Sequence, residues 1–241
     1  MRLTSEQSET ILAHLHRQSS LAGDHAWSRR QYAPMHIHSP VLRSLRDVLC
    51  QVWPEHSVAF DVVFEAPADV CVDFHSDYES LGPFVYQSWS SIANRDFVSV
   101  HFNLTPDGGH LRTLDWPVLS WVHHVCIVRC GIYSAPHRLL NTLCRPLFWL
   151  FAKDHTNEAR VGNVFDNMRP HSVSSGKVRT SYVVRLVRNS VYITLESLQR
   201  SASRSRASKR LTQVILPHLV LQGREGCSVE QVPWSELETI E

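Results

Sequence analysis

The stretch VAFDVVFEAPADVCVDFHSD, residues 58–77, decides the fold class of this chain. Its two ends, 58–65 and 70–77, are rich in β-branched and aromatic residues, which pack well on a pleated sheet. The letters APAD between them are typical of a turn. The stretch therefore predicts two consecutive β-strands.

Further segments of the same character follow along the chain. They are FVSVHFNLT (97–105), WVHHVCIVRCGIY (121–133), ARVGNVF (159–165), HSV (171–173) and KVRTSYVVRLV (177–187). PDGG (106–109) and SSGK (174–177) separate some of them as turns. Many short strands predict a mixed β fold with helices, whose core is a double-stranded β-helix of the jelly-roll or cupin-like kind.

Helical patterns precede these strands, at residues 5–17 and 39–53. In the second segment Ser39 suits an N-cap and Pro40 the first helical position, and apolar residues recur every three or four positions. We expect both helices to pack on a flat surface and to buttress the β core. Segment 137–152 stays unassigned, because Pro146 would break a helix there.

Length and composition indicate one domain over residues 1–241, with a helical N-terminal region at about 1–57 and a β core at about 58–221. No apolar run reaches the roughly 20 residues of a membrane span, and the start MRLTSEQSET is polar with no signal-peptide pattern behind it. We therefore expect a cytoplasmic protein. The six cysteines show no paired spacing, so we expect them to be reduced and structural.

The net charge of +1 gives no general electrostatic reason to expect a nucleic-acid or membrane-surface partner. One segment departs from this balance: RSASRSRASKR (200–210) has basic residues and serines but no acid. We interpret it as a flexible loop. The alternative is a phosphate- or nucleic-acid-binding role.

His75 and Asp77 form the first chemical signal, because a spacing of two residues puts both side chains on one face of an extended strand. An imidazole and a carboxylate there would supply two adjacent ligands of a three-ligand metal site. Iron(II) oxygenases use two histidines and one carboxylate and keep the remaining positions open. The third ligand must come from elsewhere in the fold.

The segment GNVFDNMRPHSVSSGKVRTSY (162–182) supplies candidates for the rest of the site. There His171 is followed, across a short turn, by a strand that carries Arg179 and Ser181. These two residues share a face because they too are two positions apart. A guanidinium fork with a neighbouring hydroxyl suits a carboxylate ligand, which would lie near the metal held by His171.

Taken together, HSD (75–77), N-x-x-x-H-x-V (167–173) and R-x-S (179–181) resemble the Fe(II)/2-oxoglutarate-dependent oxygenase superfamily. The R-x-S ending is similar to the small-molecule branch that includes isopenicillin N synthase. The resemblance covers residues 70–187, and the interval between His171 and Arg179 is short for that branch. It implies Fe(II) as cofactor, 2-oxoglutarate as co-substrate and O2 as oxidant.

The resemblance also implies roles for particular residues. His75, Asp77 and His171 would bind iron, and Arg179 with Ser181 would bind the distal carboxylate of 2-oxoglutarate. The expected reaction is oxidation, by default hydroxylation, of a C–H bond of a small-molecule metabolite, with release of succinate and CO2. Candidate substrate contacts are Tyr78, Glu79 and Arg169.

Three other interpretations stay open. The same chemistry could act on a protein or nucleic acid, or the chain could be a non-catalytic jelly-roll with a structural metal, which would not need Arg179 and Ser181. A zinc site could use the ligand types in WVHHVCIVRC, namely His123, His124, Cys126 and Cys130, although their spacing does not match paired zinc motifs. Hydrolase, kinase and dehydrogenase motifs are absent from the sequence.

Overall fold

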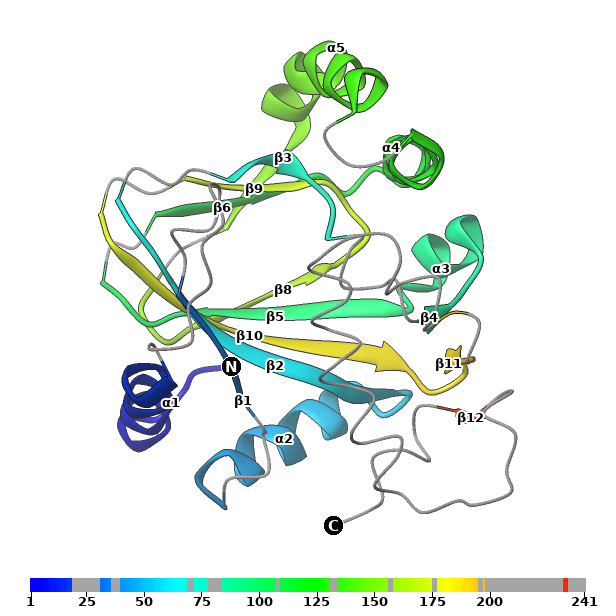
Figure 1. The fold of residues 1–241 in the computed structure, drawn as a ribbon. Helices are drawn as coiled ribbons and strands as arrows, with labels where there is room; N and C mark the ends of the chain where they lie inside the picture. Colours follow the sequence, from blue (N-terminus) through cyan, green and yellow to red (C-terminus); the bar gives the residue numbers. More distant parts are fainter. Residues whose placement is uncertain are drawn as a thin grey trace.

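The structure is a computed structural model of the whole chain. It describes residues 1–18, 31–35, 40–68, 72–77, 84–106, 109–130, 134–155, 158–174, 177–194, 197 and 232–233. Ser39 and the basic segment 200–210 lie outside these residues, as do parts of the three predicted turns. Two antiparallel sheets face one another, with helices on their outer sides (Figure 1).

The larger sheet, which we call the major sheet, has five strands. In spatial order they are β1 (Gln31–Met35), β2 (His56–Ala66), β10 (Arg179–Arg188), β5 (Phe97–Asn103) and β8 (Gly162–Asp166). Every neighbouring pair is antiparallel. Four of these strands were predicted from the sequence to within a few residues, whereas β1 was not.

The smaller sheet, the minor sheet, has four antiparallel strands. In spatial order they are β3 (Val72–His75), β9 (His171–Ser174), β6 (His110–Thr113) and β7 (Lys153–His155). A third, small sheet consists of β12 (Val232–Pro233), β11 (Tyr192–Ile193) and β4 (Phe84–Val85). The mixed fold of helices and antiparallel strands is thus confirmed. In the described part of the chain no ladder joins the two large sheets into a closed barrel, so the jelly-roll stays a prediction.

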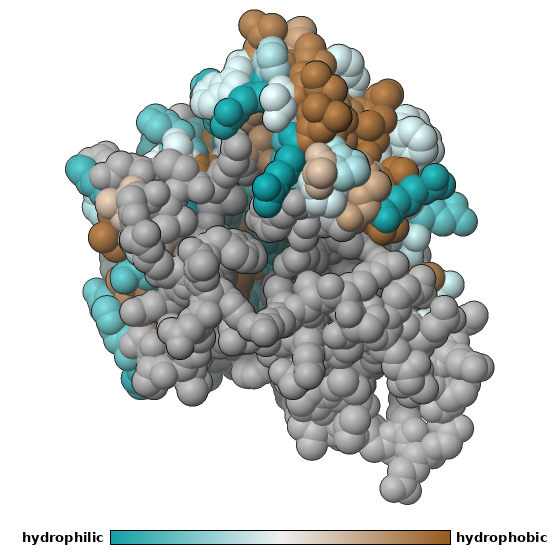
Figure 2. Space-filling view, turned by 45° about the horizontal axis from the view of Figure 1, so that its top comes forward, coloured by the Kyte–Doolittle hydropathy of each residue, from teal (hydrophilic) through white to brown (hydrophobic). Residues whose placement is uncertain are grey.

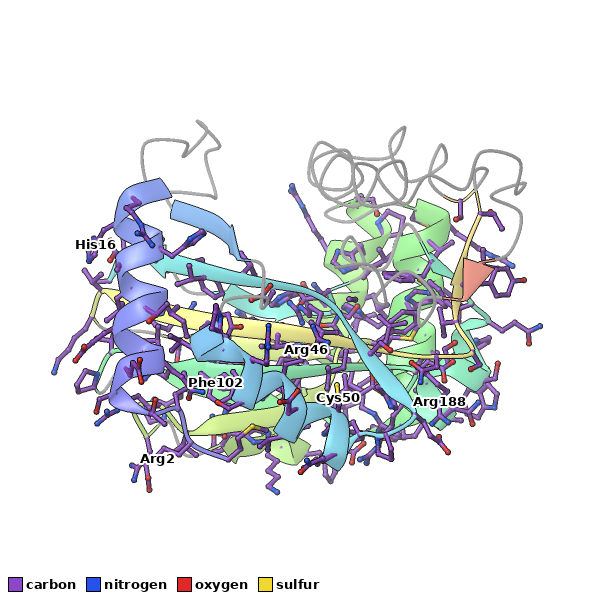
Figure 3. The ribbon with its side chains drawn as sticks, turned by 90° about the horizontal axis from the view of Figure 1, so that it is seen from below. Arg2, His16, Arg46, Cys50, Phe102 and Arg188 are labelled. Atoms are coloured by element: carbon purple, nitrogen blue, oxygen red, sulfur yellow. The ribbon has the colours of Figure 1, made fainter. Side chains whose placement is uncertain are left out.

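The two N-terminal helices were predicted correctly and lie where expected. Helices α1 (Ser5–Gln18) and α2 (Pro40–Val52) lie across the outer face of the major sheet, and Phe102 lies beneath them (Figure 3). Their buried leucines and Ile11 form one core with the apolar residues of β5 and β10. Burial of this apolar surface fixes the sheet against the helices.

Strand β10 has an apolar face and a polar face. Tyr182, Val184 and Leu186 belong to the core beneath α1 and α2. Because side chains alternate along a strand, Arg179, Ser181 and Arg185 point the other way, into the space between the sheets. Even so, Arg179 is 1% exposed and Ser181 0% exposed. The major sheet therefore presents buried polar groups to the minor sheet.

The predicted strand at 121–133 is wrong, because residues 117–130 form a helix, α4 (Pro117–Cys130). The abundance of valine and isoleucine in this segment suggested a strand. The buried residues Leu119, His123 and Ile127, however, recur every four positions, which is the spacing of one helix face. Helical periodicity was the better signal here.

Residues 137–151 of the unassigned segment 137–152 are also helical, within α5 (Ala135–Phe151), and Ala152 is the C-cap. Pro146 lies inside this helix, where it removes one backbone hydrogen bond. Buried Cys144 and Phe148 pack with Phe74 of β3 and offset that cost. The remaining described helix is α3 (Ser88–Asn94). None of the described helices is both long and apolar enough to cross a bilayer.

The outer side of β10 offers a test of this packing. The Tyr182 hydroxyl donates a 2.7 Å hydrogen bond to Oδ2 of buried Asp61 on β2. Burial, and then the Asp61 charge, raise the pKa of Tyr182 well above its usual range. We predict that Tyr182→Phe lowers the free energy of unfolding by about 1–3 kcal/mol, because Asp61 loses this bond in a dry environment.

Denaturant unfolding measures this loss. A double-mutant cycle with Asp61→Asn should give a coupling of about 0.5–3 kcal/mol between the two side chains. A coupling indistinguishable from zero would contradict the pairing.

Candidate metal centre

Two histidines meet across neighbouring strands of the minor sheet. In the antiparallel register of β3 and β9, His75 lies directly opposite His171. Side chains opposite each other in such a pair point to the same face, and here the ring centroids are 4.3 Å apart. Strand register alone therefore brings together two imidazoles that are 96 positions apart in the sequence.

Asp77 completes the group from just beyond the end of β3. Its backbone N–H donates to the Asn167 carbonyl at 3.3 Å, which holds the chain beside the loop that leads into β9. Its carboxylate oxygens lie 3.4 Å from His75 Nε2 and 3.5 Å from His171 Nε2. One ligand atom from each residue lies within 4.8 Å of the others, as a single bound metal ion requires.

The orientation of His171 is set by its backbone surroundings. Its Nδ1 lies 2.9 Å from the carbonyl oxygen of Arg169, which can only accept a hydrogen bond. Nδ1 therefore carries the proton and Nε2 presents a lone pair toward Asp77 and His75. Metal-binding histidines are commonly fixed in this way.

Arg169, a predicted substrate contact, has a second set of contacts here. Its guanidinium forms ion pairs with Asp115 and, at 3.2 Å, with Asp166. The side chain is thus engaged by two carboxylates, while its carbonyl orients His171. The other two predicted substrate contacts, Tyr78 and Glu79, lie outside the described residues.

Sequence reasoning missed Arg185, which contacts a predicted metal ligand directly. Its guanidinium, on β10 of the major sheet, reaches across to Oδ2 of Asp77 and also contacts Ser99 and Asn167. Ser99 in turn donates to Asn167 Oδ1 at 2.8 Å. A signal was available, because Arg185 has the same parity on its strand as Arg179 and Ser181.

These contacts keep the ligands in the protonation states that a metal needs. Burial alone opposes ionisation of Asp77, but Arg185 and then His171 outweigh it and lower the pKa of its carboxyl well below the usual range. Burial, and then His75, lower the pKa of His171. At neutral pH the group therefore offers a carboxylate and a neutral imidazole, both of which can coordinate.

The predicted co-substrate anchors, Arg179 and Ser181, lie on the facing sheet. Arg179 lies 5.8 Å above the Phe64 ring, and Ser181 is the register partner of Asn103. Within the described residues the buried Ser181 hydroxyl has no hydrogen-bond partner. Leaving a buried hydroxyl unsatisfied is costly, so this position suits a polar ligand.

His101 on β5 connects the anchor side with the metal side. Burial, and then the positive charges of Arg179 and Arg185, lower its pKa to about 3. His171 and Asp77 also act on it, so His101 lies within electrostatic range of both parts of the site. Neither ring nitrogen has a hydrogen-bond partner in the described part of the chain.

The path from His171 to Arg179 differs from the prediction in one respect. We expected the anchor strand to follow the histidine across a turn as its neighbour. Instead β9 pairs within the minor sheet and β10 within the major sheet, so the chain crosses between sheets. The two groups therefore face each other across the space between the sheets rather than lying side by side on one sheet.

The alternative zinc site has a different role in the structure. His123 is buried on α4, its Nδ1 3.3 Å from the Ser76 hydroxyl and its Nε2 2.7 Å from Asn141 Oδ1. Asn141, on α5, donates to the Phe74 carbonyl at 3.2 Å. This network ties both helices to the strand that carries His75. Among the described residues, the potential metal ligands that converge are His75, Asp77 and His171, not those of α4.

Solved structures of known proteins resemble this fold. The non-haem alpha-ketoglutarate-dependent carbocyclase SnoK, from nogalamycin biosynthesis, matches over 79% of this chain and 78% of its own, with 13% identity and a TM-score of 0.53. The chain shares its fold with this alpha-ketoglutarate-dependent enzyme. The resemblance recognised in the sequence motifs is thereby confirmed at the level of the fold.

Other solved structures match with lower TM-scores. EctD from S. alaskensis matches over 78% of this chain and 68% of its own, at 15% identity and a TM-score of 0.49. HygX from Streptomyces hygroscopicus, solved with nickel and 2-oxoglutarate, matches over 77% and 79%, at 13% identity and a TM-score of 0.46. No family model and no curated protein sequence matches the chain.

Buried neutral histidines predict acid lability. Burial lowers the pKa values of His101 and His123 to about 3 and that of His124 to about 4. The unfolded chain binds protons at these histidines near pH 6.5, so below that pH it binds more protons than the folded chain. Stability must then fall with falling pH.

We predict that the free energy of unfolding decreases from about pH 6.5 toward pH 4 by up to about 1.4 kcal/mol per pH unit for each such histidine. Chemical denaturation in the presence of a chelator, repeated at several pH values, measures the slope. His101→Gln should make the slope of the unfolding free energy with pH smaller by the contribution of one histidine. A slope unaffected by that substitution would contradict the neutral, buried state of His101.

Proposed function

We propose that this chain is an Fe(II)- and 2-oxoglutarate-dependent dioxygenase, formed by one domain over residues 1–241. His75, Asp77 and His171 bind iron, and Arg179 with Ser181 binds the distal carboxylate of 2-oxoglutarate. The enzyme oxidises a C–H bond of a small-molecule metabolite, most simply by hydroxylation, and releases succinate and CO2.

The observation that carries this proposal is the juxtaposition of two groups. Three ligand atoms of the His-Asp-His type lie within 4.8 Å of one another at the end of β3 and on β9. Buried Arg179 and buried Ser181, whose hydroxyl has no hydrogen-bond partner among the described residues, lie on the polar face of the opposite sheet. A structural metal site would have no use for the second group.

The charges of the site favour the same ligand. Two guanidinium groups, Arg179 and Arg185, act on His101 from the polar face of the major sheet. A planar guanidinium pairs well with a carboxylate, in a bidentate geometry. A dicarboxylate that reaches from the metal to Arg179 would make such a pair.

When bound, Fe(II) would activate O2, the oxidant, and 2-oxoglutarate would supply two of the four electrons that O2 takes up, the substrate C–H bond supplying the other two. The chain's own residues supply position. Arg185 holds the Asp77 carboxylate, and the Arg169 carbonyl fixes the tautomer of His171. Arg179 and Ser181 orient the co-substrate by a planar fork and a hydroxyl, which removes rotational freedom before the reaction.

The proposed substrate class rests on the fold likeness. SnoK is described as a carbocyclase of nogalamycin biosynthesis, which is small-molecule chemistry. We propose a small-molecule substrate for this chain as well, with Tyr78 and Glu79 as contacts. The guanidinium of Arg169 is engaged by carboxylates. We therefore propose that Arg169 orients His171 through its backbone carbonyl and does not contact the substrate.

Metal and co-substrate binding can be tested without knowing the substrate. Anaerobic addition of Fe(II) and then 2-oxoglutarate should produce a visible charge-transfer absorption band, because the co-substrate chelates the iron. His75→Ala, Asp77→Ala and His171→Ala should each abolish the band by lowering metal affinity while leaving circular dichroism largely unchanged. A folded, iron-loaded protein that shows no band would refute the assignment.

Arg179 separates the oxygenase from a structural metal protein. Arg179→Ala should weaken 2-oxoglutarate binding by about 2–5 kcal/mol, because the distal carboxylate loses its partner in a poorly hydrated site. Arg179→Lys keeps the charge but loses the planar fork, so its affinity for 2-oxoglutarate should lie between those of the parent and Arg179→Ala. Titration of the charge-transfer band with 2-oxoglutarate measures the dissociation constant of each variant.

Arg185→Leu is the matched comparison on the same face of the same strand. It should weaken iron binding, because Asp77 loses the cation that holds it. Arg179→Ala should leave iron binding near normal. If Arg179→Ala left the 2-oxoglutarate affinity unchanged, the anchor would be withdrawn, and a metal-binding protein without catalysis would be preferred.

A further inference from the structure

Helices α4 and α5 expose an unusual amount of apolar surface. Leu139, Leu143, Leu150 and Phe151 of α5 are 60%, 66%, 74% and 61% exposed. On α4, Val118 is 53% exposed. Figure 2 shows the brown, hydrophobic residues gathered over this part of the molecule. Contiguous apolar patches of this kind mark interaction sites more often than scattered exposed residues do.

The exposed residues form continuous stripes. Leu139, Leu143, Leu147 and Leu150 follow one another at spacings of four, four and three, which places them on one side of α5. Val118 and Val122 are likewise four apart on α4. We call these two stripes, with the exposed Trp121 of α4, the outer face.

Packing against the minor sheet does not use this outer face. The opposite sides of the two helices bury Leu119, Cys144 and Phe148 against Phe74 of β3. That contact is complete without the leucines of the stripe, which stay exposed. The outer face therefore calls for a separate explanation.

Helices α4 and α5 carry basic side chains but no acidic one. Between Asp115 and Asp154 the sequence contains no acidic residue, whereas Arg129 of α4 and Arg138 of α5 are exposed. The two bordering acids are already engaged, Asp115 with Arg169 and Asp154 with Arg112. The surface is thus apolar and cationic, although the whole chain is nearly neutral.

A surface that is both apolar and cationic favours an anionic lipid surface over a second copy of the chain as its partner. A second copy of the chain, related by two-fold symmetry, would bring the same arginines together with no carboxylate on α4 or α5 to pair with them. A lipid surface with anionic headgroups pairs with the arginines and takes up the leucines, the phenylalanine and the tryptophan. Helices that combine an apolar stripe with arginines outside that stripe lie in the plane of such interfaces and need not cross them.

We propose that the outer face of α4 and α5 is a docking surface for a membrane that contains anionic lipids. The chain would bind peripherally, with Leu139, Leu143 and Leu150 inserted at the headgroup boundary and Arg129 and Arg138 beside the headgroups. This proposal stands independently of the metal site. It differs from the expectation drawn from net charge, because an average of +1 conceals a local excess of positive charge.

Co-sedimentation of the full chain with lipid vesicles tests the proposal directly. Vesicles of phosphatidylcholine with phosphatidylserine should pellet the protein at low ionic strength. Vesicles of phosphatidylcholine alone should bind it several-fold more weakly, because each arginine near an anionic surface contributes about fivefold. Added salt should weaken binding to the anionic vesicles.

Matched variants locate the surface. Leu139→Gln with Leu143→Gln should lower the affinity for anionic vesicles about tenfold or more, because less apolar area is inserted. The matched control is Val48→Gln with Val52→Gln on α2, which are 42% and 60% exposed and should bind as the parent does. Arg129→Glu with Arg138→Glu should lower the affinity by more than about tenfold, compared with Arg17→Glu with Arg43→Glu elsewhere on the surface.

Several results would overturn the proposal. It fails if neither kind of vesicle binds, or if the control pairs weaken binding as much as the outer-face pairs. It also fails if size-exclusion chromatography shows a concentration-dependent dimer that Leu139→Gln with Leu143→Gln abolishes while vesicles do not bind. The face would then be an interface between copies. Binding to an acidic peptide, without binding to vesicles, would assign it to a protein partner instead.

Discussion

The contact between Arg185 and Asp77 joins the two sheets at the point where the candidate metal ligands meet. Arg185 belongs to the major sheet, which α1 and α2 hold from the outer side, and Asp77 follows the end of a minor-sheet strand. A half-buried carboxylate beside two imidazoles is stabilised by a cation, and in the described structure Arg185 supplies one. The contact between the two sheets and the charge of the site therefore both depend on the pair Arg185 and Asp77.

From this constraint the polarity of the major sheet follows. Its outer face is apolar because α1 and α2 cover it. Its inner face is polar and lies opposite Asp77, which is ionised, and His171, which is neutral. His101 lies on this inner face and stays neutral through burial and the neighbouring guanidinium groups. A second histidine, His123, is also neutral but lies on the opposite side of β3, where it positions the strand rather than faces the site.

Sequence reasoning recovered the parts of this arrangement that local geometry controls. Arg179 and Ser181 share a face of β10, as their spacing predicts, whereas Asp77 lies close to His75 from just beyond the end of β3. The meeting of His75 with His171 came from motif resemblance, since no local rule gives the register of β3 and β9. Arg185 was missed because its partner lies across the space between the sheets. The strand wrongly assigned at 121–133 shows that β-branched composition misleads where buried residues follow a helical spacing.

Helices α4 and α5 are the least predictable part of the fold, and they connect to the site by one route. Their inner sides hold β3 through His123, Asn141 and Phe74, so they act on the candidate metal ligands through the strand itself. Their outer sides face away from that strand. The network around His123 therefore lies between the outer face and the candidate metal ligands.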